Sequence, residues 1–493
     1  MTNPPRILYI PFDHLNRSKG VLKDADASQD VVVLVESQRM LSGRNWHPLR
    51  LFFMVSAARH FAEDLRADGF TVEYIQAPTT IDGLVEAKSR YTDREVWCAE
   101  PSSFEQSRAL TEFGVTFAEN DFFLTSRAHF ALWADKQSSY VMENFYRAQR
   151  QRLSLLMDNG KPVGGRWNFD ADNRLSPPKN YTWPDYFVHR RDVIDAEVAA
   201  RFDVDPGTTW ATTRAAALEQ LHYFIENHLA GFGPYEDAIP ADNWAVHHSL
   251  LSPYLNVGLL HAEEVVAAAV DAFEAGRAPI ESVEAFVRQI IGWREYINGM
   301  YWYLGEDYRE RNELGATRPL LPVFTDSTKT QMNCVREVVR GVEERAWVHH
   351  IPRLMVLSNL ALITGVNPRE FLDWMREQFI DASDWVMVPN IIGMATHADG
   401  GELMTKPYAS GGAYLSRMTQ FCKGCAYDPK LRVGERACPY TTLYWDFLDR
   451  HRERFSTNHR MFQQINGLKR LSDLPELKVR AAEVLDGLSN GTI

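Results

Sequence analysis

The sequence predicts an α/β domain followed by an all-α domain, and three observations carry this prediction. In residues 1–125, short apolar runs alternate with amphipathic stretches, which is typical of a doubly wound parallel sheet. In residues 212–493, apolar residues recur at helical spacing, so we expect a helical domain about twice as large. Residues 126–211 include a long stretch without a period, and we expect them to connect the two domains.

The alternation in the N-terminal domain follows the chain element by element. The expected strands are residues 6–12, 30–36, 71–76, 95–100 and 115–120, and the expected helices are 47–70, 81–91 and 103–113. Neither G-x-G-x-x-G nor G-x4-G-K-[ST] occurs in this domain. The usual dinucleotide and nucleoside-triphosphate loops are therefore excluded.

The connector is rich in Gly, Pro, Asn and aromatic residues over residues 163–187, where no period is visible. We expect this stretch to cross the surface between the two domains. Each of its basic residues is either a phosphate contact or a solvated charge; they are Arg166, Lys179, Arg190 and Arg191.

The C-terminal domain is predicted to be a series of amphipathic helices. The helical segments cover residues 213–229, 247–273, 281–305, 332–365 and 367–385. Pro253 and Pro368 stand where helices are expected to begin, because proline is well tolerated in the first helical turn. Within residues 332–365 we expect the helix to break at Pro352.

Composition limits the class of protein. The 493 residues are 45% apolar and 24% charged, as in ordinary globular proteins. No run approaches about 18 apolar residues and the N-terminus has no secretory pattern, so we expect no membrane span and a cytoplasmic location. Five cysteines in such a chain argue against a disulfide framework. A net charge of −12 opposes nucleic-acid binding by the whole surface but permits a local basic groove.

Three cysteines lie together in FCKGCAYDPKLRVGERACP, as Cys422-x2-Cys425-x12-Cys438, and Cys334 lies far upstream. Four thiolates suit either zinc or a [4Fe-4S] cluster. The spacing favours the cluster, because zinc sites more often use two local pairs and because proline after the last cysteine recurs in cluster loops. The remaining alternative is a set of unpaired core cysteines, but a polar Gly-containing loop is poor core material.

Three further stretches could carry chemistry. His349 and His350 stand on an apolar helix and point about 100° apart, so one could face a cavity as a proton donor while the other packs. Residues 379–401 place carboxylates and an amide in an apolar run. These polar groups could bind a heterocycle, bind a metal or cap a helix. Residues 247–256 offer hydroxyls and N–H groups before a helix, and with Arg294 they could hold a diphosphate.

Together these stretches resemble the photolyase/cryptochrome superfamily, and most closely its bacterial iron–sulfur branch, the prokaryotic (6-4) photolyases. The resemblance covers nearly the whole chain. Besides the cysteine loop and the Cys334 helix, the motifs that carry it are VGGRWNFD (163–170), HSLLSPYLN (248–256), RQIIGWREY (288–296), VHHIPRLM (348–355), DASDWVMVPNIIGM (381–394) and TKPYASGGAY (405–414).

The resemblance implies a noncovalent, U-shaped FAD in the helical domain and a [4Fe-4S] cluster on the four cysteines. Asp381 would hold the isoalloxazine edge and Asn390 would lie opposite flavin N5. The residues expected along the FAD diphosphate or ribityl chain are Ser249, Leu250, Leu251 and Ser252. Those expected to contact the cofactor or the lesion are Gln289, Trp293 and Arg294.

The implied activity is light-dependent repair of (6-4) photoproducts in UV-damaged DNA, by a protein expected to be a monomer. The lesion would be flipped into a pocket over the flavin and would receive an electron from excited reduced FAD. His350 is expected to act as the acid with support from His349, and Tyr408 and Lys406 to line the same pocket. A cyclobutane dimer needs no such acid, so the histidine pair favours the (6-4) lesion.

The sequence departs from the branch at two places, the antenna site and the flavin-reducing chain. The lumazine antenna of the branch is expected near a glutamate where this chain has Met40, which puts the 6,7-dimethyl-8-ribityllumazine in doubt. Trp374 keeps the first place of the flavin-reducing chain, but Met375 and Asp326 occupy the other two. We therefore expect slow photoreduction or another route, such as Trp347 or Trp385.

Two other functions remain open on the sequence. A blue-light-sensing cryptochrome has the same fold and cofactors, although the histidine pair favours repair and the altered electron chain argues against signalling. A light-independent Fe–S module for nucleic-acid binding, as in primase large subunits, would explain the cysteines but not the α/β domain or the flavin motifs.

Overall fold

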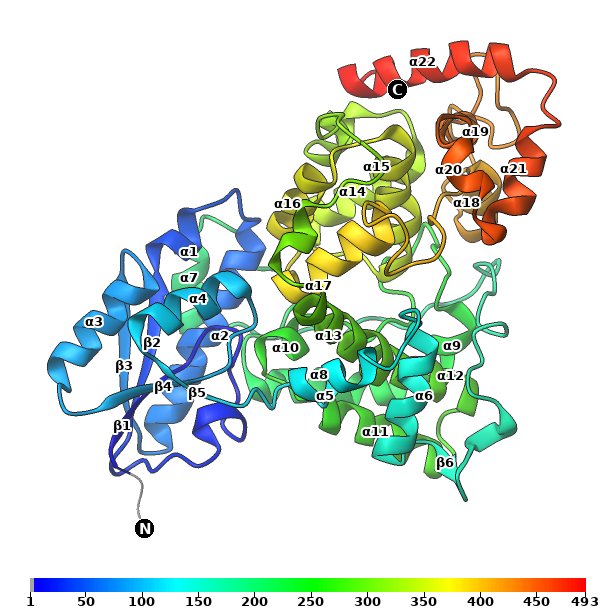
Figure 1. Cartoon of the computed structure of the whole chain (residues 1–493). Helices are drawn as coiled ribbons and strands as arrows, with labels where there is room; N and C mark the ends of the chain where they lie inside the picture. The colour runs from blue at the N-terminus through cyan, green and yellow to red at the C-terminus, as the bar shows by residue number, and fades with distance from the viewer. Residues whose placement is uncertain (1–3) are drawn as a thin grey trace.

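A parallel sheet forms the centre of the N-terminal domain in the computed structural model, which describes residues 4–493. Within these residues the sheet has five strands in the order β3-β2-β1-β4-β5 (Figure 1). They are β1 (Arg6–Tyr9), β2 (Val31–Ser37), β3 (Thr71–Ala77), β4 (Glu95–Ala99) and β5 (Thr116–Ala118). The doubly wound α/β fold expected from the alternation is confirmed, although β1 is shorter than expected because Pro11 has no N–H for the ladder.

Helices follow the strands as the sequence indicates. They are α1 (Gln38–Ser42), α2 (Pro48–Ala67), α3 (Thr80–Arg90) and α4 (Phe104–Phe113). Thr79 and Ser103 cap α3 and α4 by accepting the backbone N–H of the third helical residue. The order of the strands reverses between β1 and β4, and crevices at such a switch point favour ligand binding.

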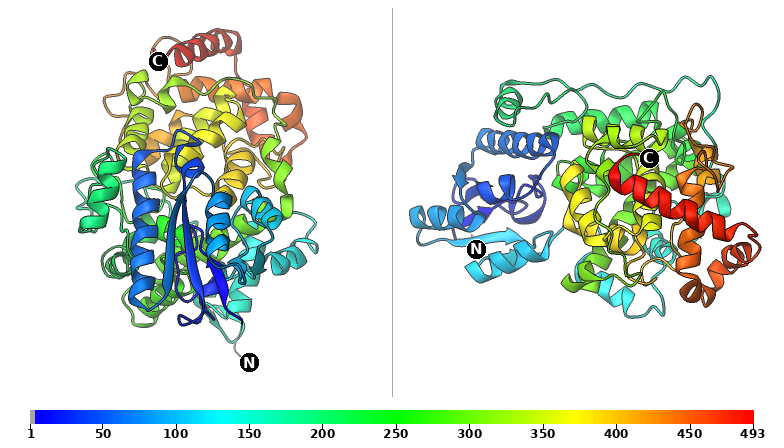
Figure 2. Two further views of the ribbon diagram at one scale, coloured as in Figure 1. Left: turned by 90° about the vertical axis from the view of Figure 1, so that its left-hand side faces the viewer. Right: turned by 90° about the horizontal axis from the view of Figure 1, so that it is seen from above.

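The chain between the two domains falls into three parts. Helices α5 (Arg127–Ala134) and α6 (Met142–Leu153) pack on the helical domain, and β6 (Met157–Asp158) pairs with β7 (Lys161–Pro162). Residues 166–192 contain no helix or strand and cross the outside of the molecule (Figure 2, right). By packing, α5 and α6 belong to the helical domain. The domain boundaries near residues 125 and 211 stay a prediction.

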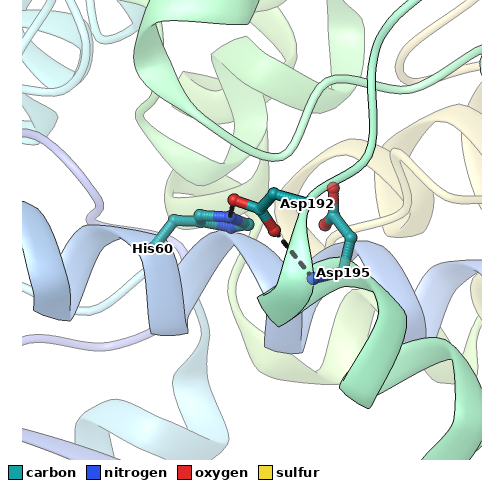
Figure 3. Close-up of side chains that lie close together, drawn as sticks. All are labelled: His60, Asp192 and Asp195. Atoms are coloured by element: carbon teal, nitrogen blue, oxygen red, sulfur yellow. Dashed lines mark hydrogen bonds and ion pairs between the residues drawn. The ribbon is translucent and has the colours of Figure 1, made fainter.

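Helix α7 (Val193–Arg201) brings the connector back to the α/β domain, where it packs along α2. His60 Nε2 lies 2.8 Å from Asp192 Oδ2 (Figure 3). His60 Nδ1 lies 2.8 Å from the carbonyl oxygen of Ser56. Asp192 also accepts the backbone N–H of Asp195 as the helix cap. Arg201 completes the attachment through an ion pair with buried Glu36.

The helical domain forms the larger lobe (Figure 1). Its first helices are α8 (Arg214–Asn227), α9 (Leu229–Tyr235), α10 (Ser252–Val257), α11 (Ala262–Glu274), α12 (Ile280–Val287) and α13 (Glu295–Leu304). They are followed by α14 (Asn333–Arg345), α15 (Asn359–Thr364), α16 (Pro368–Gln378) and α17 (Asp384–Pro389). The last are α18 (Gly412–Met418), α19 (Pro439–Arg450), α20 (Arg452–Ser456), α21 (Phe462–Leu468) and α22 (Leu474–Asn490).

The break expected at Pro352 lies earlier in the chain. Helix α14 ends at Arg345, Ala346 caps it with a left-handed φ of 53°, and the next helical turn begins at His350. Pro352 stands near the start of that new turn, where its missing N–H costs no helical hydrogen bond. The histidine pair therefore lies at a helix start and not inside a long helix. No helix of residues 4–493 is long and apolar enough to span a bilayer.

Candidate flavin and lesion pocket

A pocket in the middle of the helical domain collects the motifs singled out in the sequence. Its wall comes from the end of α9, from α10 and the segment before it, from α12 through α13, from the turn between α14 and α15, and from α16, α17 and the turn after α17. Among the residues that line it are Ser249, Leu250, Leu251, Ser252, Gln289, Trp293, Arg294, His350, Asp381 and Asn390. Leu250 has a left-handed φ of 59°, so the backbone turns sharply where this segment meets the pocket.

Three π-helical turns form much of this wall, at Arg288–Arg294, Pro352–Ser358 and Asn390–Ala395. Each widens a helix by one residue per turn, a feature that is rare in proteins and is found mostly at functional sites. Gln289 and Trp293 come from the first turn, and Asn390 comes from the third. The sequence pattern did not reveal these turns, because one extra residue leaves an apolar helical stripe almost unchanged.

Asp381 is fixed by an arginine and a serine. Arg353 makes two hydrogen bonds of 2.9 Å to its carboxylate, one to each oxygen, and Ser252 Oγ donates at 2.6 Å. Burial alone would raise the pKa of Asp381, but Arg353 and Ser252 outweigh burial and hold the pKa below its usual value. The group is thus a carboxylate, which is suited to accept N–H groups.

Arg294 has unused hydrogen-bonding capacity. Its Nη2 donates to the carbonyl oxygen of Leu255 at 3.0 Å, but its Nε and Nη1 atoms are buried without a partner. The guanidinium lies over the rings of Phe123 and Trp385, 4.2 and 4.9 Å from their centroids. Burial lowers the pKa of Arg294 to about 10, so it remains a cation. A buried cation with free donors beside a hydroxyl-rich segment fits an anionic cofactor group.

The adjacent histidines occupy different environments. His350 lines the pocket, whereas His349 is buried and stacks on His248 with ring centroids 4.2 Å apart. The side chain of His350 is open to the pocket, yet the protein around it and then the charge of Arg353 lower its pKa to about 4, and burial lowers the pKa of His248 to about 3. Burial also holds the pKa of His349 well below its usual value. All three imidazoles are therefore neutral near pH 7 in this pocket.

Glu236 is a wall residue that the sequence analysis did not single out. It follows α9 and accepts a 2.7 Å hydrogen bond from Gln289 Nε2. Burial raises the pKa of Glu236 to about 8, with the charge of Arg288 opposing that rise. Asp237 next to it has a pKa of about 6, also mainly because of burial. Glu236 is recognised as a wall residue only from its contact with Gln289, which lies 53 residues later in the chain. No local motif signals that contact.

The residues considered for the electron path divide between the pocket wall and its surroundings. Trp374 is buried on α16 and packs against Phe324, Phe371 and Phe379, while its neighbour Met375 lines the pocket. Asp326 caps a short turn by accepting the N–H of Thr328. Trp347 and Trp385, expected as alternative electron carriers, both line the pocket.

Tyr408 is partly buried in the loop before α18. Burial and then the charge of Asp170 raise its pKa, while Arg174 and Arg460 oppose that rise. Tyr408 therefore lies close to connector residues 170–174. Lys406, expected in the pocket with Tyr408, is exposed two residues earlier.

The four cysteines converge at the far side of the helical domain. Cys334 comes from the first turn of α14, Cys422 and Cys425 from the loop after α18, and Cys438 from the cap of α19. All four line one small enclosed space, and none forms a disulfide. Burial and then the nearby thiols raise the pKa of Cys334 well above its usual value, which indicates a site that needs a positive group to hold thiolates.

A second cavity lies between the two lobes, at the carboxyl ends of the strands. It is lined by Tyr9, Asp13 and Met40 from the α/β domain and by Arg376 and Asp384 from the helical domain. This is the place where the expected antenna would lie. Met40 offers the antenna no carboxylate, so Met40 does not fit the contact that a glutamate makes in the branch.

Comparisons with known proteins agree on one family. A family model described as deoxyribodipyrimidine photo-lyase-related protein matches residues 8–212. A (6-4) photolyase of Agrobacterium fabrum is 39% identical over 502 residues, covering 97% of this chain and 99% of that protein. A class III photolyase structure from Agrobacterium tumefaciens has a TM-score of 0.58 at 16% identity, covering 99% and 98% of the two chains. A Synechocystis cryptochrome structure has a TM-score of 0.55 at 14% identity, covering 81% and 84%.

Proposed function

The chain belongs to the photolyase/cryptochrome superfamily, in the branch of the bacterial (6-4) photolyase, and on this premise we propose that it repairs (6-4) photoproducts in UV-damaged DNA by light. The observation that carries the proposal is the central pocket, where a carboxylate, an arginine with two buried unpartnered nitrogens and an open histidine meet. The relative that the chain matches over nearly its full length is itself named a (6-4) photolyase.

FAD fits the residues present in this pocket. Arg294 and the hydroxyl of Ser249 would hold its phosphates, because they supply a cation and a donor in one place, while Ser252, whose hydroxyl donates to Asp381, would line the ribityl chain. Asp381, kept ionised by Arg353, would accept the N–H groups of the flavin ring, and Asn390 would lie near its reactive edge. When bound in its reduced form, FAD supplies one electron to the lesion after absorbing blue light.

The protein's own task is to hold the flipped lesion and to manage one proton. His350 is the pocket histidine, and we propose that it is the acid, with buried His349 behind it as support. Its pKa of about 4 reflects the pocket without DNA. The negative charge of bound DNA would raise that pKa, because a nearby opposite charge favours the imidazolium. Trp293 would bound the lesion as an apolar surface, and Tyr408 would approach it from the connector side.

We propose that the cysteines hold a [4Fe-4S] cluster and not zinc. In tetrahedral zinc sites, Zn–S bonds of 2.3 Å place the sulfur atoms about 3.8 Å apart. In residues 4–493, the one group of three or more possible metal-ligand atoms within 4.8 Å of one another is His60, Asp192 and Asp195. No three of the four cysteine sulfurs are therefore that close, and this wider spacing favours a group larger than a single zinc ion.

The proposal includes neither a lumazine antenna nor a second subunit. Met40 replaces the expected carboxylate in the cavity between the lobes. A single pocket engages a single lesion, so one chain is sufficient for the reaction. We place the electron path to the flavin on Trp374 or on the pocket-lining Trp347, whose ring lies 5.8 Å from that of Trp244.

The test is repair of synthetic oligonucleotides that carry either a (6-4) photoproduct or a cyclobutane dimer, with reduced protein, in blue light and in darkness. We expect light-dependent restoration of the (6-4) substrate alone, and at least about 100-fold slower repair by His350→Ala. Exposed His222→Ala is the matched control and should repair normally. Absence of repair of both lesions in protein with photoactive flavin would favour a blue-light sensor instead.

A further inference from the structure

Glu236 and Gln289 form a polar pair in the wall of the pocket described above. Gln289 Nε2 donates to Glu236 Oε1 at 2.7 Å. Both residues line the space that holds His350 and Trp293. Within residues 4–493, the second carboxyl oxygen of Glu236, Oε2, has no hydrogen-bond partner, and it is not sealed from the pocket. The pair therefore presents an unused carboxyl oxygen and an amide oxygen to whatever enters.

The charges around Glu236 decide which form of the carboxyl is present. Arg288 favours the carboxylate, whereas Asp237, Asp170 and Glu284 oppose it. These groups come from the first π-helical turn, from the segment after α9, from the connector and from α12. Arg174 and Arg417 face Asp237 next to it. Three negative groups surround this half-buried carboxyl, and the imidazoles of His248 and His350 on the neighbouring wall are neutral.

The hydrogen bond with Gln289 is consistent with a neutral carboxyl. In a carboxylic acid the carbonyl oxygen accepts and the hydroxyl donates. With Oε1 accepting from Gln289, the proton belongs on Oε2, the carboxyl oxygen that has no partner in the described residues. Burial raises the pKa of Glu236 to about 8, so near pH 7 this group carries a proton while the pocket histidines do not. Carboxylic acids kept neutral in this way serve as hydrogen-bond donors in enzyme sites.

We propose that the neutral Glu236 carboxyl donates a hydrogen bond to a carbonyl oxygen of the flipped pyrimidine, while Gln289 Oε1 accepts the adjacent ring N–H. This inference rests on the proposed function and adds a specificity-determining pair to it. A pyrimidine ring presents a carbonyl and an N–H side by side, which this donor and acceptor complement. No proton is transferred in this contact.

The pair gives lesion binding a defined dependence on pH. The protonated form of Glu236 is required, so specific binding is present below its pKa of about 8 and is lost as the pH rises through that value. Above it, a carboxylate would face the carbonyl oxygen, and both would be left without a proton between them. Because one proton is involved, specific affinity should fall about tenfold per pH unit on the alkaline side.

The experiment measures binding in darkness, so that photochemistry does not enter. FAD-loaded protein is titrated with fluorescent oligonucleotides that contain a (6-4) photoproduct or no lesion, from about pH 6 to about pH 9.5, and the ratio of the two affinities is followed. Wild type is compared with Glu236→Gln, Glu236→Ala and the exposed control Glu274→Gln. Flavin content and thermal unfolding establish that each variant is folded.

We expect three outcomes. The lesion preference of wild type and Glu274→Gln falls at alkaline pH; Glu236→Gln, whose amide donates at every pH, keeps the preference without that fall; and Glu236→Ala loses about tenfold or more in preference at neutral pH. An alkaline fall in Glu236→Gln identical to wild type, or an unaltered preference in Glu236→Ala, would overturn the inference. Failure of the proposed function looks different, because wild type itself would then show no light-driven repair.

Discussion

At the level of single residues, the pocket depends on charges that are paired inside the protein. Asp381 and Arg353 are the clearest case, because the arginine contacts both carboxylate oxygens in a buried place. Glu236 is the opposite case, a carboxyl without a matching cation in contact. The two acids therefore differ in protonation within one pocket, and environment decides each role.

Asp381→Asn is predicted to destabilise the protein and to release its flavin. The change leaves the buried part of Arg353 without its counter-ion, a loss that costs about 3–5 kcal/mol. Equilibrium unfolding in urea, with flavin content measured beside it, checks this; exposed Asp242→Asn should behave like wild type. An unchanged midpoint and full flavin occupancy in Asp381→Asn would contradict it.

The same ion pair predicts how stability depends on acid. The pKa of Asp381 is lower in the folded protein than in the unfolded chain, because Arg353 and Ser252 outweigh burial. Its contribution to stability is thus complete above the ordinary carboxyl pKa of about 4 and is lost as the pH falls through the lower folded value. Urea midpoints measured at decreasing pH should converge for wild type and Asp381→Asn, and parallel curves would argue against this account.

At the level of elements, helices that are distant in sequence meet at the cysteine site and at the contact between α5 and α13. The thiols depend on α14, the loop after α18 and α19 coming together, with Gly412 close to Cys438 because a Cβ there would lie 3.0 Å from its sulfur. Helix α5 approaches α13 even more closely, since a Cβ on Gly299 would lie 2.0 Å from the ring of Phe130. These contacts are local requirements that substitutions can test.

Cys438→Ser is predicted to lose the cluster, whereas Cys98→Ser should keep it. Cys98 is buried in β4, away from the other thiols, and its pKa is raised mainly by burial, as for a structural cysteine. Iron and acid-labile sulfide per protein, with the visible absorption of the cluster, provide the measurement. Bound zinc in wild type, or equal iron in both variants, would show that the cluster assignment is wrong.

Gly299→Ala is predicted to destabilise the protein by about 1–3 kcal/mol, because the added methyl group forces α5 away from α13. Gly411→Ala is the control, since its Cβ would meet neighbours only at ordinary distances of 3.7 Å or more. Thermal unfolding compares the two. A similar midpoint for both variants would mean that the helices separate without cost.

The sequence predicted the elements better than the shape of the pocket wall. All five strands of the sheet were predicted, and the signal was plainest for β1 and β2, which are buried along their whole length and therefore leave a continuous apolar run. The π-helical turns did not follow, since they arise from tertiary packing and not from a local period. Glu236 was missed for the same reason, as its contact with Gln289 joins segments without a shared motif.

At the level of the whole molecule, the two lobes share one hydrophobic core. Leu8 of β1 and Phe53 of α2 belong to the same buried cluster as Leu251 and Ile291 of the helical domain. Arg50 on α2 strengthens the junction by donating to the carbonyl oxygen of Phe379 at 2.8 Å. A sequence divided into domains suggests independent units, but the packing joins the α/β lobe to the flavin pocket.

We therefore predict that the lobes unfold together. Circular dichroism and flavin release should show one coincident transition in wild type, because a shared core cannot be exposed on one side alone. Arg50→Met leaves buried carbonyl groups at the junction without their donor, so the α/β lobe should then unfold first and separate the two signals. Half-buried Arg94 donates to the carbonyl oxygen of Gln29 within the α/β lobe, so Arg94→Met should retain a single transition. Two separate transitions already in wild type would mean that the junction transmits no stability, and that the cavity between the lobes opens independently of the pocket.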